Sequence, residues 1–68
     1  MYEIKLELKD KLLDGRTISN LAKKIGVSRV HLSYILNGKL TTTKTTAYVI
    51  VKSCDSEAEI EDYFYKKA

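Results

Sequence analysis

The chain has no proline, only three glycines, one cysteine and one histidine in 68 residues. A single cysteine cannot form an internal disulfide, and one cysteine with one histidine is too few for a structural zinc site. No apolar run reaches the roughly 18 residues of a membrane-spanning helix, and the first ten residues alternate charged and apolar side chains, unlike a signal peptide. We therefore expect one cytoplasmic domain over residues 1–68, with no disulfide, metal or cofactor.

Carboxylates are absent from the whole stretch between Asp14 and Asp55. The same stretch contains seven cationic side chains, although the net charge of the chain is only +3: Arg16, Lys23, Lys24, Arg29, Lys39, Lys44 and Lys52. Seven positive charges without a nearby carboxylate repel one another, and binding to a polyanion relieves that repulsion. Each phosphate that is neutralised also releases condensed counterions, which favours such binding. The charge pattern therefore favours nucleic acid as a partner over a solvated cationic face.

The three glycines divide the chain into segments with helical spacing of apolar residues. We expect helices over 2–14, 18–25, 29–36, 44–54 and 56–64, and hence an all-α, five-helix domain. Gly15 and Gly26 are expected to end the first two helices in the left-handed conformation, and Ser56 with Glu59 has the spacing of a capping box. The β-branched residues of 44–54 leave an edge strand open as an alternative there.

Residues 17–38 have the proportions of a helix-turn-helix, since two short helices are joined by the glycine-containing turn KIGVS. Thr17 and Ser28 precede the two helices, where a hydroxyl can accept a hydrogen bond from a free backbone amide. Leu32, Ile35 and Leu36 follow in the second helix at the spacing of one buried face.

The segment TISNLAKKIGVSRVHLSYILNGK resembles the helix-turn-helix of the phage Cro and repressor proteins, the XRE-type family. The residues that match at the family spacing are Leu21, Ala22, Gly26, Val27, Ser28, Ser33, Ile35, Asn37, Gly38 and Lys39. The motif covers about a third of the chain, and the five-helix layout extends the likeness to a lambda-repressor-like domain.

The resemblance implies a transcription regulator that binds double-stranded operator DNA, most readily as a homodimer, with helix 29–36 in the major groove. The positions that would meet bases are Ser28, Arg29, Val30 and Tyr34. The positions that would meet phosphates are Thr17, Ser33, Asn37, Lys39 and Lys44, together with the threonines of the 39–46 linker. Arg29 can fork onto guanine O6 and N7, and Val30 can pack on a thymine methyl group.

Two positions depart from the family pattern, because Ile18 stands where a glutamine is usual and Leu36 where a glutamate is common. The outward face of helix 29–36 also centres on Val30 and Tyr34, and exposed apolar and aromatic side chains can mark a protein contact. The alternative is therefore an antirepressor of a phage lysogeny switch, which binds a partner repressor through this face. The acidic segment 55–62 either meets a basic partner or, as we favour, serves the helix cap.

The sequence gives little support for catalysis, and we do not expect this protein to be an enzyme. His31 and Cys54 are the obvious base and nucleophile candidates, but no glycine-rich phosphate loop and no paired carboxylates accompany them. His31 is interpreted as a solvated helix residue and Cys54 as a small buried apolar residue. The aromatic residues Tyr63, Phe64 and Tyr65 fit either the core or a dimer contact.

Overall fold

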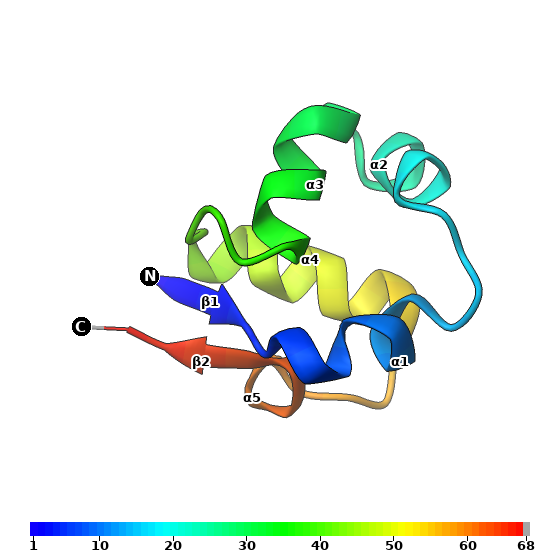
Figure 1. The fold of residues 1–68 in the computed structure, drawn as a ribbon. Helices are drawn as coiled ribbons and strands as arrows, with labels where there is room; N and C mark the ends of the chain where they lie inside the picture. The colour runs from blue at the N-terminus through cyan, green and yellow to red at the C-terminus, as the bar shows by residue number, and fades with distance from the viewer. Residues whose placement is uncertain (68) are drawn as a thin grey trace.

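The computed structural model describes residues 1–67 and shows α-helices packed around a central helix, with a short two-stranded sheet at one side (Figure 1). In chain order the elements of this part are β1 (Tyr2–Ile4), the 3₁₀ helix η1 (Leu6–Leu8), α1 (Lys9–Leu13), α2 (Ile18–Ile25), α3 (Arg29–Leu36), α4 (Lys44–Cys54), α5 (Ile60–Tyr63) and β2 (Phe64–Lys66). The expected five-helix, predominantly α-helical fold is confirmed. Within residues 1–67, no helix combines the length and the apolarity needed to cross a membrane.

The first expected helix is wrong over its N-terminal half, which forms β1 and η1 before α1 begins at Lys9. Tyr2 and Ile4 are buried while Glu3 between them is only partly covered, so these residues also fit the two-residue period of a strand. β1 pairs antiparallel with β2 in the register Ile4 to Phe64. The backbone of Tyr2 also exchanges hydrogen bonds of 2.7 and 2.8 Å with Thr42. Partners distant in sequence therefore override the helical spacing here.

The last expected helix is shorter than 56–64, because only Ile60–Tyr63 is helical and Phe64 already belongs to β2. The capping box is formed by Glu59 and Asp62, not by Ser56 and Glu59. In contrast, α4 is a helix over the expected residues, so the edge-strand alternative is wrong. Thr43 caps α4 by accepting a hydrogen bond of 3.3 Å from the Thr46 amide.

One apolar core holds these elements together, and α4 contributes Ala47, Ile50 and Val51 to it with no exposed surface. Every other named element except η1 adds to the same cluster: Tyr2, Ile4, Leu12, Leu13, Leu21, Ala22, Leu32, Ile35, Leu36, Ala58, Ile60, Tyr63 and Phe64 are its remaining buried members, with Ala58 in the α4–α5 connection. The cluster includes Tyr63 and Phe64 but leaves Tyr65 47% exposed. The core therefore takes two of the three C-terminal aromatic residues.

The turn between α2 and α3 depends on Gly26, which ends α2 with φ at 80° and donates its N–H to the Ala22 carbonyl at 2.9 Å. This confirms the expected left-handed cap. At the end of α1 the left-handed cap is Asp14, one residue before the expected Gly15, although Gly15 also has positive φ.

Replacing Gly26 by alanine is expected to lower the free energy of unfolding by about 1–2 kcal/mol, measured by urea denaturation. An added Cβ would meet no atom within 4 Å, so the loss comes from backbone strain and not from a clash. Gly26→Asn is the matched control, because asparagine tolerates the left-handed region and should lose less. An alanine variant as stable as the parent would show that this turn does not need its left-handed conformation.

Candidate nucleic-acid interface

The caps and the turn predicted for the helix-turn-helix are present. The Thr17 hydroxyl oxygen accepts a hydrogen bond from the Asn20 amide at 3.1 Å, and the Ser28 hydroxyl oxygen accepts one from the His31 amide at 3.0 Å. Each hydroxyl still has its own O–H to donate. In Figure 1, α2 and α3 lie next to each other along the upper edge of the molecule, joined by the short turn at Gly26.

The two faces of α3 are sharply different. Leu32, Ile35 and Leu36 have no exposed surface, whereas Val30 is 53% and Tyr34 is 54% exposed. Ser28 and Arg29, at the start of the helix, are exposed as well. The structure therefore places all four predicted base-reading residues at the solvent-accessible surface, within the first turns of one helix.

The predicted phosphate-contacting residues are distributed over three elements. Thr17 precedes α2, Lys44 begins α4, and Lys39 follows α3; all three are exposed. Ser33 and Asn37 lie together at the C-terminal end of α3, where the Asn37 amide donates a hydrogen bond of 3.1 Å to the Ser33 hydroxyl oxygen.

One of the linker threonines cannot serve as a phosphate contact. Thr42 is only 5% exposed, and its backbone N–H and C=O are both bonded to Tyr2. Thr43 uses its hydroxyl oxygen to cap α4. The expectation that the linker threonines as a group face phosphate is therefore wrong for Thr42, which belongs to the sheet edge.

The seven cationic side chains of the acid-free stretch divide into two groups. Arg16, Lys24 and Lys52 each donate a hydrogen bond to a backbone carbonyl, at 3.1, 2.9 and 2.6 Å respectively. The other four are exposed and have no hydrogen bond or ion pair from their side chains within residues 1–67: Lys23, Arg29, Lys39 and Lys44. Part of the positive charge thus stabilises the fold, and these four cations remain available to a ligand.

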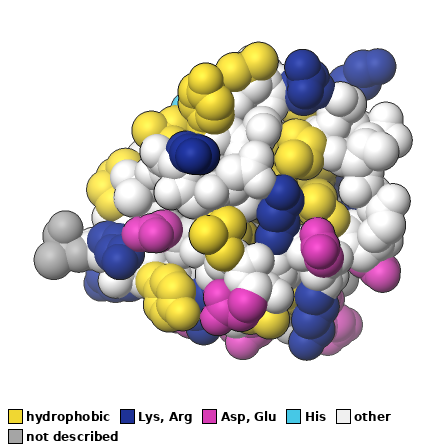
Figure 2. Space-filling model, in the orientation of Figure 1, with side chains coloured by type: hydrophobic (Ala, Val, Ile, Leu, Met, Phe, Trp, Pro, Cys, Tyr) yellow, Lys and Arg dark blue, Asp and Glu magenta, His cyan; other side chains and the backbone are white. Residues whose placement is uncertain are grey.

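The two departures from the family pattern contribute little to the exposed apolar surface. Leu36 is fully buried, and Ile18 is half-buried and packs against the core. The apolar outer surface of α3 comes instead from Val30 and Tyr34. In the view of Figure 2, apolar and basic side chains lie together along the upper part of the molecule, and the visible acidic side chains all lie in the lower half.

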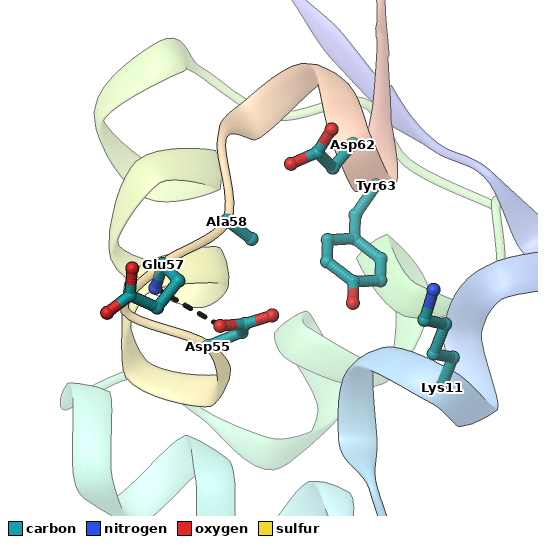
Figure 3. A pocket seen from close by; sticks show the side chains of 6 residues that line it. All are labelled: Lys11, Asp55, Glu57, Ala58, Asp62 and Tyr63. Atoms are coloured by element: carbon teal, nitrogen blue, oxygen red, sulfur yellow. Dashed lines mark hydrogen bonds between the residues drawn. The ribbon is translucent and has the colours of Figure 1, made fainter.

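Three acidic residues of the C-terminal segment border a pocket of about 320 Å³ that is lined by α1, the α4–α5 connection and α5 (Figure 3). In Figure 1, α1 and α5 lie at the opposite end of the molecule from α3. Its lining residues are Lys11, Asp55, Glu57, Ala58, Asp62 and Tyr63. The Asp55 carboxylate accepts a hydrogen bond from the Glu57 amide at 3.1 Å, and the Asp62 carboxylate accepts one from the Glu59 amide at 2.8 Å. These two acids therefore hold a turn and a helix cap, as favoured from the sequence.

The two side chains considered for catalysis lie on different helices, with His31 exposed on α3 and Cys54 at the last position of α4. Cys54 packs against the core. Burial raises the pKa of the Cys54 thiol, and the positive charges of Arg16 and Lys24 offset this only in part. A thiol with a raised pKa has less thiolate and is a poorer nucleophile.

Alkylation of Cys54 by iodoacetamide in the folded protein at mildly alkaline pH should be slower than alkylation of the same thiol in the urea-unfolded chain. The raised pKa of the Cys54 thiol reduces the thiolate fraction in the folded state, and packing against the core limits access. N-acetylcysteine amide, with and without urea, controls for the effect of urea on the reagent. Equal rates for folded and unfolded protein would contradict this account of the thiol.

A protein-family model described as helix-turn-helix matches residues 8–60 of the chain. No curated protein sequence and no solved structure matches the chain. The matched range contains α1 to α4 and leaves both strands of the small sheet outside.

Proposed function

Because this chain belongs to the XRE-type helix-turn-helix family of DNA-binding transcription regulators, we propose that it acts on an operator in the manner of the phage Cro and repressor proteins. The observation that carries this proposal is the surface of α2, α3 and the following linker. Four cationic side chains with no hydrogen bond or ion pair within residues 1–67 lie there, in a stretch that has no carboxylate between Asp14 and Asp55. One of them, Arg29, begins α3.

Base recognition is assigned to the start of α3. Arg29 is exposed and has no protein partner within residues 1–67, so its guanidinium can donate two parallel hydrogen bonds to guanine O6 and N7. The exposed Val30 offers a methyl group to thymine, and the Ser28 hydroxyl keeps one O–H to donate after capping the helix. Tyr34, one turn further along, reaches a base edge or a phosphate.

Phosphate binding is assigned to the exposed hydroxyl, amide and ammonium groups around this helix, which position the protein without selecting sequence. The residues are Thr17, Ser33, Asn37, Lys39 and Lys44. Arg29 is assigned to a base, so three free cations remain for phosphates: Lys23, Lys39 and Lys44. If each of them neutralises one phosphate, the slope of log affinity against log salt is about −2.7 for each protomer. Affinity should then fall about fortyfold between roughly 50 and 200 mM salt.

The dimensions of the domain favour a homodimer on DNA. One protomer measures 30 × 24 × 21 Å and presents one recognition helix. Operators of this type have half-sites about 34 Å apart, so a second recognition helix must come from a second copy. Each protomer would then cover one half-site.

A second candidate function rests on the exposed apolar pair Val30 and Tyr34, which are four residues apart on α3 and therefore neighbours on its surface. Such a pair also suits a protein interface, where aromatic side chains are enriched. The corresponding function is an antirepressor of a temperate phage, which covers a partner repressor with this face of α3 in place of a DNA groove.

A mobility-shift assay separates the two functions. The purified protein is titrated against the DNA upstream of its own gene and against unrelated DNA of equal length, with and without a repressor encoded beside it. An operator-binding protein prefers its own upstream DNA when alone. Equal weak binding to both DNAs, together with a stable complex with the repressor, would overturn the first proposal and support the second.

A further inference from the structure

A hydrogen-bonded chain connects α1 to the end of α3. The Lys9 ammonium donates to the side-chain oxygen of Asn37, and the Asn37 amide nitrogen donates to the Ser33 hydroxyl oxygen at 3.1 Å. Gly38, just after α3, also lies close to the Leu6 side chain of η1. A Cβ added at Gly38 would be 3.2 Å from that side chain. η1 and the start of α1 therefore pack against the C-terminal end of the recognition helix.

This arrangement fixes the direction in which the Asn37 amide points. An ammonium group can only donate, so Lys9 requires the oxygen of the Asn37 amide, and the NH₂ group turns toward Ser33. The Asn37 oxygen and the Ser33 hydroxyl oxygen thus each already accept one hydrogen bond from within the protein. Four donor hydrogens remain: two on Lys9, one on the Asn37 amide and one on the Ser33 hydroxyl.

The electrostatic position of Lys9 also matters. The C-terminal end of a helix carries a partial negative charge, which disfavours a phosphate there, and α3 has no basic residue in its last turn. Lys9 brings a positive charge to this end from another helix. Its acidic neighbours in the sequence, Glu7 and Asp10, form no ion pair with it within residues 1–67.

We propose that Lys9, Ser33 and Asn37 together form a binding site for one DNA backbone phosphate, in which Lys9 supplies the charge and orients the Asn37 amide. This inference rests on the proposed operator binding, and it adds a residue from outside the motif to the interface. Lys9 lies among the acids of the N-terminal segment, so the charge pattern of the sequence gives no sign of this role.

The salt dependence of DNA binding tests this site, because its slope counts the phosphates that are neutralised. The variant is Lys9→Met, and Lys11→Met is the matched control: it removes the same charge from the same helix at a residue that lines the acidic pocket. Lys9→Met should make the slope less steep by about 0.9 and weaken binding severalfold on all DNA sequences alike. Lys11→Met should leave the slope unchanged.

A second variant, Lys9→Gln, guards against a folding defect, since glutamine keeps a donor for the Asn37 oxygen but has no charge. It should show the same reduction in slope as Lys9→Met. If the parent protein shows salt-dependent DNA binding and both Lys9 variants keep the parental slope, the phosphate site is overturned while operator binding stands. If the parent protein shows no such binding, both proposals fail together.

Discussion

Truncation of Leu32 to alanine is expected to lower the free energy of unfolding by about 2–5 kcal/mol. Leu32 has no exposed surface and lies at the centre of α3, within the single core of the domain. A core in a chain of 68 residues rarely supplies more than about 3–5 kcal/mol of net stability. A substantial fraction of the variant should therefore be unfolded at room temperature, which urea titration followed by circular dichroism would measure.

Val30→Ala is the matched control, because it also shortens an aliphatic side chain of α3, at a position that is 53% exposed. Its effect on the free energy of unfolding should be within about 0.5 kcal/mol. Equal losses for the two variants would contradict the assignment of the inner and outer faces of the helix.

Replacement of Arg29 by alanine is expected to weaken operator binding by about 1–3 kcal/mol, or roughly 5- to 150-fold, and to abolish discrimination at one base pair. The exposed guanidinium has no protein partner within residues 1–67, so its removal leaves no buried group unsatisfied. Fluorescence anisotropy with a set of singly substituted operators would measure the affinity for each base.

Lys39→Ala controls for the loss of charge alone, since Lys39 is assigned to a phosphate. This variant should weaken binding to every DNA by a similar factor and reduce the slope with salt by about 0.9. The base-reading role of Arg29 fails if its alanine variant behaves in the same way, with no change of preference at any base pair.

The helices of the motif could be predicted from the sequence because their signals are local. Thr17 and Ser28 cap the helices they precede, and Gly26 ends α2. The N-terminal strand could not be predicted, because Tyr2 and Ile4 fit a helix or a strand equally well in isolation. Their strand conformation depends on Lys66 and Phe64, which lie at the other end of the chain.

The surface of the candidate site could be predicted only in part for the same reason. The spacing of α3 correctly placed Val30 and Tyr34 outside and Leu32 inside. Counting charges could not show that Lys24 bonds to a backbone carbonyl 29 residues away, nor that Lys9 bonds to a side chain 28 residues away. Such pairings depend on how the helices pack, and they determine which cations remain free for DNA.

We propose that α3 enters the major groove, and protection of guanine N7 from methylation by dimethyl sulfate tests this placement, because N7 lies in that groove. The DNA upstream of the gene is treated with and without saturating protein, and with the Arg29→Ala variant. With the parent protein, protected guanines are expected in two half-sites. With the Arg29→Ala variant, one guanine in each half-site should become reactive again. Methylation of every guanine at the same rate with and without saturating protein would contradict this placement of α3.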